Sequence, residues 1–178
     1  MQNLNLNDLL RYGLAGAIFL VFLVAAFDEP QAILKSSDSN GVVAAGLIGI
    51  AFTIGSLVYA THRAVPYPAF YWLFAKLNKR PESTMQMDIK RWRNLSKKDS
   101  LQQRMGDWAA QVHFLYCIAW AGSTALLLGR YACWAHTNLW NSVASVTGLM
   151  FVCALLHHCR YQRWEKQIFV EDESSKAS

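Results

Sequence analysis

The amino-acid sequence predicts an all-α integral membrane protein with four transmembrane helices and both termini in the cytoplasm. Hydrophobic residues make up 53% of its 178 positions, whereas charged residues make up only 16%. The apolar residues gather into four windows of about 18 to 20 residues, the length that a helix needs to cross about 30 Å of hydrocarbon. The basic residues gather between the second and third windows. A single membrane domain explains all three observations.

The first window needs to be distinguished from a secretory signal, because a short charged start precedes its apolar core. It ends at Phe27 in an acidic, proline-containing stretch rather than in a small-residue cleavage site, and further apolar windows follow. We therefore interpret it as a permanent span. The four predicted spans are residues 9–27, 41–59, 109–128 and 139–156.

The distribution of basic residues predicts the orientation. Only two of the 17 Lys and Arg residues, Lys35 and Arg130, fall between spans one and two or between spans three and four. Because basic residues are retained on the cytoplasmic side, these two connections are predicted to be outer loops, the first of them a solvated hairpin. The outer loops lie near 28–40 and 129–138, and the cytoplasmic parts are a middle segment, 61–107, and a C-terminal extension, 157–178.

The cytoplasmic middle segment begins with two prolines, Pro66 and Pro68, which redirect the chain. Residues 67–78 are rich in aromatic side chains and end in basic ones, which predicts a helix lying in the membrane interface. A docked cytosolic helix is the alternative. Capping residues beyond Pro81 predict a second helix, and a third helix is expected to start near Lys97 and to run unbroken through the third span.

The helix predicted beyond Pro81 has an apolar stripe opposite basic residues. This stripe exceeds what solubility requires, so we interpret it as a binding surface for a cytosolic protein. The predicted partner-binding residues are Met85, Ile89, Arg91, Trp92, Arg93 and Trp164.

Other basic residues flank the spans, where long side chains reach the lipid headgroups. Anionic lipid stabilises each such residue by about 1 kcal/mol. Lipid therefore explains the net charge of +5, and direct binding of nucleic acid is not expected. The predicted lipid-anchoring residues are Arg11, Arg63, Lys76, Lys79 and Arg80.

Small residues recur along one face of the second span. Ala45, Gly49 and Thr53 are spaced by four residues, so this face has little side-chain bulk. In lipid, small residues permit two helices to approach closely. The stripe therefore predicts either packing within one subunit or the interface of a homo-oligomer.

The chain after the fourth span is predicted to keep its helix and then to lose it. Aromatic and basic residues from Tyr161 to Lys166 indicate that the fourth helix extends into the cytosol. The acidic tail that starts at Glu171 is expected to be disordered, or ordered only by a partner.

Histidines from three helices are predicted to meet at the cytoplasmic mouth of the bundle. They are His62, His113 and the pair His157 and His158, and Cys153 precedes His157 by one helical turn. Such a spacing is compatible with a transition metal or a proton relay. Histidines at membrane ends are more commonly hydrogen-bonding residues of the interface. We therefore predict no bound metal and no cofactor.

The sequence does not predict an enzyme. Arg130 and His136 have the spacing of the arginine and histidine in ribonucleases of the HEPN type, but the charge distribution places them outside, away from cytosolic RNA. The motifs of nucleotide-binding loops, zinc proteases and serine hydrolases do not occur. The interiors of the four predicted spans contain no Asp or Glu. Proton-coupled transport and membrane hydrolysis usually need such carboxylates.

Four spans, inside termini and a large basic middle segment form a plan that resembles small polytopic membrane subunits of bacterial anti-phage defence systems, such as the membrane component of Kiwa. The resemblance covers the whole chain as architecture. It implies a homo-oligomer in the bacterial inner membrane that senses envelope disturbance or opens a pore, and that works with a cytosolic effector encoded beside it.

We therefore expect a membrane sensor or scaffold that recruits or regulates a cytosolic effector protein. A pore-forming effector or small channel is the first alternative, because spans three and four contain polar residues. A membrane enzyme that uses the histidine and cysteine residues is the second.

Overall fold

The computed structural model describes residues 12–36, 41–78 and 98–177, with side chains described at 12–36, 45–78 and 106–170. Nearly all of this part of the chain is helical and none of it forms a β-strand, which confirms the predicted all-α fold. The helices in chain order are α2 (Leu14–Ala26), α3 (Asp28–Ser36), α4 (Gly41–Ala64), α5 (Pro66–Leu77), α7 (Lys98–Tyr131) and α8 (Trp140–Ala177).

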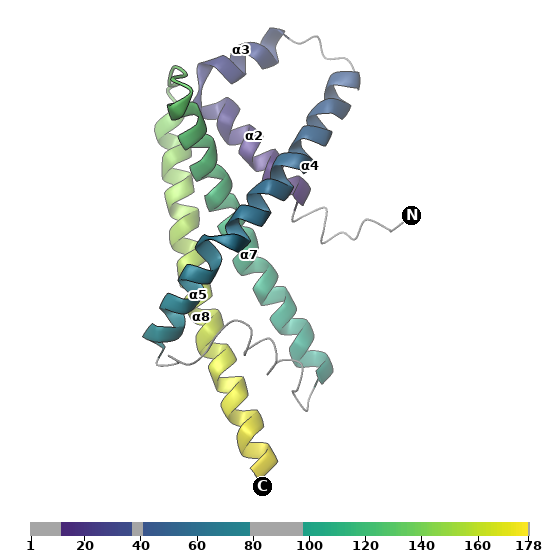
Figure 1. Cartoon of the computed structure of the whole chain (residues 1–178), viewed down its shortest axis with the longest axis vertical. Helices are drawn as coiled ribbons and strands as arrows, with labels where there is room; N and C mark the ends of the chain where they lie inside the picture. The colour runs from purple at the N-terminus through teal and green to yellow at the C-terminus, as the bar shows by residue number, and fades with distance from the viewer. Residues whose placement is uncertain (1–11, 37–40, 79–97, 178) are drawn as a thin grey trace.

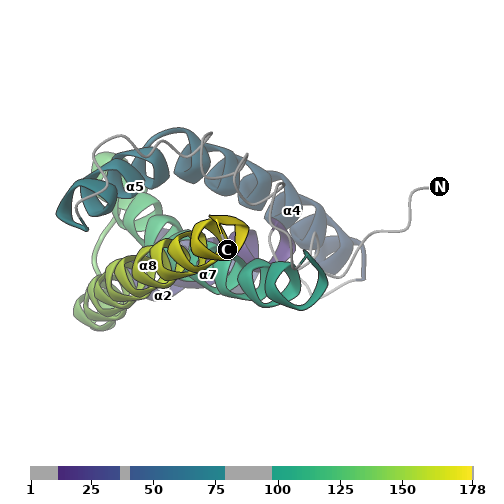
Figure 2. The ribbon, with the colours of Figure 1, turned by 90° about the horizontal axis from the view of Figure 1, so that it is seen from below.

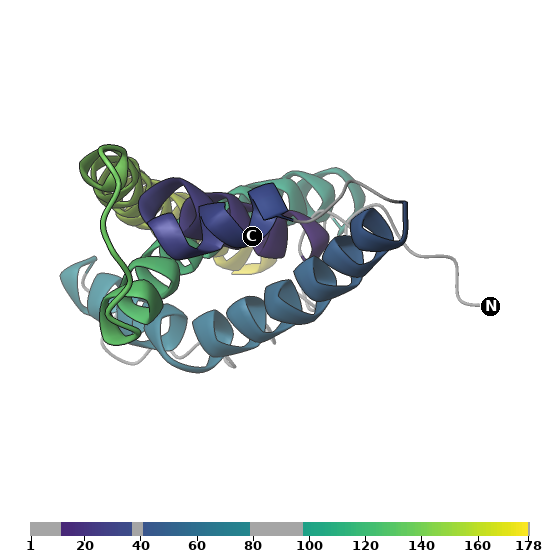
Figure 3. The same ribbon diagram turned by 90° about the horizontal axis from the view of Figure 1, so that it is seen from above.

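The two longest helices, α7 and α8, form the axis of the molecule. They run antiparallel and are joined by a short connection at one end (Figure 1). α2 packs against both α7 and α4, whereas α4 crosses obliquely, and its first turns stand away from the α7–α8 pair (Figure 3). From the opposite end, α4 and α5 lie along one side of α7 and α8 (Figure 2).

Two glycines determine how closely α2 and α4 cross. Gly16 and Gly55 are both buried at the crossing. A Cβ atom on Gly16 would overlap the carbonyl group of Ala51, and a Cβ atom on Gly55 would overlap the carbonyl group of Tyr12. Small residues at such a point permit the close backbone approach that holds helices together in an apolar medium. Any larger side chain here must separate the two helices.

The predicted small-residue stripe lies on a different face of α4. Ala45, Gly49 and Thr53 are all exposed in the single chain, and nothing lies within 4 Å of a Cβ atom placed on Gly49. The Thr53 hydroxyl donates to the Gly49 carbonyl at 3.0 Å. The stripe therefore takes no part in packing between the described helices, and its role as a subunit interface stays a prediction.

The end of α2 is fastened to the connection between α7 and α8. Phe27 and His136 form an isolated antiparallel β-bridge, flanked by backbone hydrogen bonds of 3.1 and 3.2 Å. The fully buried Phe27 ring packs edge-on against the rings of His136 and Trp134. We call this the bridge end. α3 begins at the next residue, so the connection predicted near 28–40 is helical from Asp28 to Ser36.

Three helical segments are long and apolar enough to cross a membrane: Ala45–Leu77, which joins α4 and α5, Gly106–Tyr131 and Trp140–Val170. α2 is a shorter apolar helix of 13 residues. That length rises only about 20 Å, compared with about 30 Å of hydrocarbon. Large apolar side chains, Leu127 among them, are exposed along these helices, as expected where lipid is the neighbour. The helices are thus compatible with a membrane protein, and four spans stay a prediction.

Both long helices extend beyond the predicted spans. α7 begins at Lys98, which confirms the predicted start near Lys97 and the unbroken course through the third span. α8 continues as one helix to Ala177, so the prediction of a disordered tail is wrong for its backbone up to that residue. A continuous helix satisfies its backbone hydrogen bonds without help from tertiary contacts. The acidic composition of the tail alone does not reveal that the helix continues into it.

Candidate functional site

Six buried tyrosine and histidine rings from four helices pack together on the side away from the bridge end. Each of the six residues is 8% exposed or less. Polar rings buried within helices of bilayer length are energetically costly, which makes them candidates for a functional role. We call this cluster the tyrosine–histidine layer. Its members are His62 of α4, Tyr67 and Tyr71 of α5, His113 and Tyr116 of α7, and His158 of α8.

The break between α4 and α5 brings two of these rings together. α4 ends at Ala64, and Pro66, which has no N–H to donate, begins α5 after the single residue Val65. In an unbroken helix, residues five apart would point about 140° away from each other. The break allows His62 and Tyr67 to stack instead, with ring centroids 5.6 Å apart.

α5 docks on the bundle through one face. Tyr67, Tyr71 and Phe74 are buried at helical spacing, whereas Trp72 is 58% exposed. The Lys76 ammonium lies 5.2 Å from the centroid of the Trp72 ring. Residues 67–78 were predicted to form either a helix in the membrane interface or a docked helix, and the buried face of α5 agrees with docking. The outward face keeps the aromatic and basic composition that predicts contact with the membrane interface.

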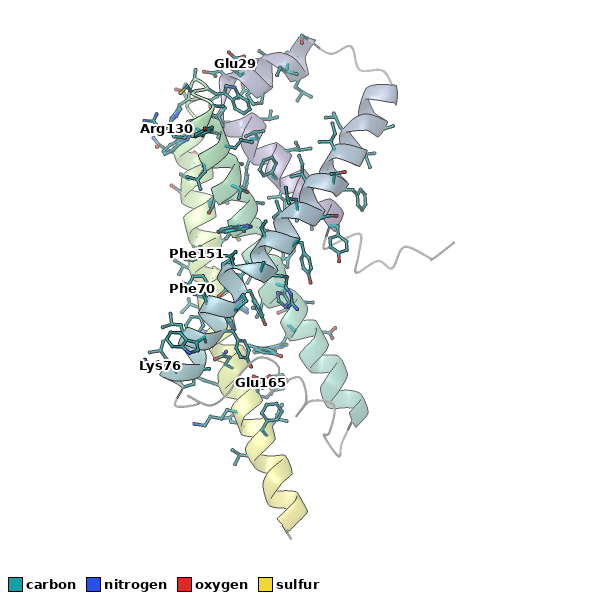
Figure 4. The ribbon with its side chains drawn as sticks, in the orientation of Figure 1. Glu29, Phe70, Lys76, Arg130, Phe151 and Glu165 are labelled. Atoms are coloured by element: carbon teal, nitrogen blue, oxygen red, sulfur yellow. The ribbon has the colours of Figure 1, made fainter. Side chains whose placement is uncertain are left out.

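The Tyr67 ring joins the three other helices of the layer. It stacks on His158 of α8 with centroids 5.3 Å apart and an interplanar angle of 3°. Its centroid lies 4.3 Å from that of His113, and it meets the Tyr116 ring edge-on at 6.2 Å. The rings of Phe70 and Phe151 add a further contact between α5 and α8. They lie between the level of Arg130 and the level of Glu165 along the molecule (Figure 4).

Hydrogen bonds connect the layer to one face of α8. The Tyr116 hydroxyl lies 3.0 Å from Nδ1 of His158, and the Tyr71 hydroxyl donates to Glu165 at 3.4 Å. The side-chain amide of Gln162 donates to the Tyr71 carbonyl at 2.9 Å. His158, Gln162 and Glu165 are all buried, and they share one helical face because they are spaced by four and three residues. α8 therefore supplies most of the polar partners.

Arg63 borders the layer. Its Nη1 lies 3.0 Å from Nε2 of His113, and its guanidinium carbon lies 5.3 Å from the centroid of the Tyr67 ring. A cation over an aromatic face is attracted by the ring quadrupole. The predicted lipid anchor is thus turned toward the protein, and lipid anchoring by this residue stays a prediction.

The layer keeps unused hydrogen-bonding capacity. Among the described residues, neither ring nitrogen of His62 nor Nε2 of His158 has a hydrogen-bond partner, although both side chains are fully buried. A buried polar atom without a partner costs about 1 to 3 kcal/mol. Across the described ranges, no group of three or more His, Cys, Asp or Glu side chains is arranged to hold a metal ion.

The structure brings together three of the four histidines that were predicted to meet. His62 and His113 have ring centroids 5.5 Å apart, and His158 joins them through Tyr67. His157 is only half-buried and is not part of the layer. The histidine prediction therefore identified the right region of the bundle.

Sequence reasoning did not group the three tyrosines, which form half of the layer, with the histidines. Tyr67 and Tyr71 are one helical turn apart, and Tyr116 follows His113 by three residues. The available signal was the helical spacing of polar rings near Pro66: His62 precedes the proline, and Tyr67 and Tyr71 follow it. Gln162 and Glu165, which extend the face of His158, were missed in the same way.

The predicted partner-binding surface lies mostly outside the described residues. Trp164 is described: it is half-buried, and its ring packs on Trp108 of α7 with centroids 5.2 Å apart. The predicted residues outside the described ranges are Met85, Ile89, Arg91, Trp92 and Arg93 of the partner surface and Arg11, Lys79 and Arg80 of the lipid anchors.

The ribonuclease-like pair belongs to the other end of the molecule. Arg130 lies near Glu29 at the bridge end, far from Lys76 and Glu165 (Figure 4). Arg130 and His136 are both exposed, and the His136 ring stacks on Trp140 with centroids 4.9 Å apart. No residue of the tyrosine–histidine layer comes from this end.

Replacing Tyr116 by Phe is expected to lower the free energy of unfolding by about 1 to 3 kcal/mol, because the buried Nδ1 of His158 loses its hydroxyl partner. Thermal unfolding of the purified protein in detergent measures the loss. Tyr131→Phe is the matched control, since Tyr131 is 90% exposed. Equal melting temperatures for the two variants would contradict a structural role for the hydroxyl.

Similarity to known proteins assigns no family to this chain. No family model, curated protein or solved structure matches it. A function is therefore inferred from the tyrosine–histidine layer and from the helices that carry it.

Proposed function

We propose that the chain is a homo-oligomeric sensor or scaffold of the bacterial inner membrane that recruits or regulates a cytosolic effector protein. The observation that carries this proposal is the continuity of α7 and α8, which run for 34 and 38 residues from apolar stretches into polar ones. A continuous helix moves as one element when its surroundings change. The two helices can therefore carry a disturbance of the membrane to a surface in the cytosol.

The tyrosine–histidine layer supports this proposal because it joins α4, α5, α7 and α8 at one level. Packed rings and buried hydrogen bonds do not deform continuously; they change between discrete arrangements. A shift of α8 would move His158 away from both Tyr67 and Tyr116. The layer is thus suited to convert a small displacement into an on-or-off signal.

The proposed partner surface is the apolar and basic stripe predicted beyond Pro81, together with Trp164. A role in anti-phage defence belongs to the proposal as well. It is supported by the predicted plan of spans, inside termini and basic middle segment, which resembles membrane subunits of such systems.

A pore formed by the oligomer is the second candidate, and one feature of α8 favours it. Asn141, Ser142 and Ser145 are exposed in the single chain, although they lie within the apolar segment Trp140–Val170. Polar side chains within a span rarely face lipid. A neighbouring subunit or an aqueous path would therefore suit this face.

Affinity purification of the full chain from native membranes is expected to recover a soluble protein at a fixed molar ratio. Ile89→Asp and Trp92→Asp are expected to reduce the recovered partner at least about tenfold, which corresponds to ~1.4 kcal/mol of binding free energy. The reason is that an apolar contact cannot solvate a new carboxylate. Quantitative mass spectrometry measures the ratio of partner to chain.

Ile33→Asp is the matched control, since Ile33 is 65% exposed on α3 at the bridge end. Partner loss with this variant too would contradict a specific surface beyond Pro81. Recovery of only lipids and the chain itself would contradict the scaffold. Ion conductance by the purified oligomer in liposomes would then support the pore.

A further inference from the structure

An apolar groove lies on the outside of the bundle between α2 and α7. Its volume is about 290 Å³. Leu14 and Ile18 of α2 form one wall, Phe114 and Ile118 of α7 form the other, and Tyr59 of α4 contributes from the third side. These helices belong to segments apolar enough to meet membrane lipid.

Polar groups occur at one end of the groove. Gln111 and His113 line it from the first turns of its α7 wall, whereas Ile118 lies further along the same helix. Arg63 follows Tyr59 by four residues on the same face of α4 and lies 3.0 Å from His113. In the part of the chain that the structure describes, Arg63 contacts His113 and Tyr67 but no carboxylate. Within the described ranges, a positive charge without a carboxylate contact therefore stands beside an apolar groove.

The composition of the groove favours a lipid chain as its occupant. Its wall from Ala110 to Ile118 extends about 12 Å along α7, and its polar lining residues Gln111 and His113 lie at one end. A hydrocarbon chain that ends in a negatively charged headgroup matches an apolar groove with a positive charge at one end.

We infer that the groove binds one acyl chain of an anionic phospholipid whose phosphate group lies beside Arg63. The apolar walls accept the methylene groups, and the guanidinium complements the phosphate charge. His113 holds the guanidinium at the end of the groove. This site is independent of the proposed cytosolic effector, because it is built entirely from α2, α4 and α7.

A photo-reactive lipid tests the site on the full chain. The protein is placed in nanodiscs that contain a phosphatidylglycerol with a diazirine in its acyl chain, and the labelled residues are identified by mass spectrometry. Labelling of Ile18, Phe114 and Ile118 is expected to exceed labelling of the exposed α8 residues Leu149 and Val152 by about tenfold. Uniform labelling of all lipid-exposed residues would overturn the proposal.

Ala110→Phe is expected to fill the groove and to remove the excess labelling, because Ala110 lines it. Ala60→Phe is the matched control on the exposed face of α4, and it should label like the unchanged chain. Excess labelling that survives Ala110→Phe would overturn the proposal, as would cross-links from the groove to a second copy of the chain.

Arg63→Gln tests the phosphate contact separately from the acyl chain. It is expected to make labelling by phosphatidylglycerol equal to labelling by a phosphatidylcholine with the same diazirine, whereas Arg63→Lys should keep the preference for the anionic lipid. Arg160→Gln, an exposed basic residue of α8, is the matched control. A preference for phosphatidylglycerol that persists in Arg63→Gln would overturn the assignment of the phosphate to Arg63.

Discussion

Gly16→Leu is expected to separate α2 from α4 and to prevent the chain from forming a stable bundle. A side chain on Gly16 overlaps the backbone of α4 at Ala51 rather than a movable side chain. Overpacking typically costs about 1 to 3 kcal/mol, and a backbone obstacle places this variant at or above the upper end of that range. Thermal unfolding in detergent and the yield of folded protein from membranes measure the loss.

Gly49→Leu provides the matched control on α4, because nothing lies within 4 Å of a Cβ atom at Gly49. Leucine has the higher helix propensity, so the melting temperature of the single chain should stay the same or rise slightly. The same variant should dissociate a homo-oligomer if the small-residue stripe forms the subunit interface. Equal destabilisation by Gly16→Leu and Gly49→Leu would show that the described crossing is not the point of closest contact.

His158→Ala is the second substitution with a large expected effect. The His158 ring is fully buried and contacts the rings of Tyr67, Tyr71, Phe74 and Tyr116. Removing a buried ring leaves a cavity, and for aromatic residues such truncations cost about 3 to 5 kcal/mol. The hydroxyl of Tyr116 loses its partner at the same time. The melting temperature in detergent is expected to fall far below that of Tyr116→Phe.

His157→Ala is the control for this experiment, since it makes the same chemical change one residue earlier, at a half-buried position. It is expected to change the melting temperature little. Comparable losses for His157→Ala and His158→Ala would indicate that the histidine pair acts through the helix surface and not through the layer. In the affinity purification, a molar ratio of partner to chain that falls for His158→Ala but not for His157→Ala would link the layer to the proposed recruitment.

The fold class was predictable because it depends on properties that accumulate over many residues. In lipid, an apolar run of bilayer length satisfies its own backbone hydrogen bonds by forming a helix, so helices at α4, α7 and α8 follow from composition. The start of α7 near Lys97 was predictable because Ser96 and Asp99 have the spacing of a capping signal and no Gly-Pro break precedes Ala109.

The crossing of α2 and α4 was harder to predict because several small residues compete for the role. Ala45, Gly49 and Thr53 form the more regular pattern, yet the contact uses Gly55. Helical spacing shows which residues share a face, but it does not show which neighbouring helix that face meets. That choice depends on the tilt of α4, which the remaining helices determine together.

The tyrosine–histidine layer was predictable only in part for a related reason. The histidines were predicted to meet because their side chains have a distinctive chemistry, and three of them do meet. Tyrosines near membrane ends usually belong to the aromatic belt, so Tyr67 and Tyr71 were assigned to the interface. Their burial follows from the bend at Pro66, and the direction of that bend is a property of the packed bundle.

The backbone bridge between Phe27 and His136 fastens α2 to the connection between α7 and α8. A rotation of α8 about this point would move its residues in proportion to their distance from the bridge. α8 is an arm of 38 residues, or about 57 Å, and a pivot of about 5° would move its far tip by about 5 Å. In the proposed sensor, a small pivot at the bridge end would thus reach the end of α8 as a displacement of about one helical turn.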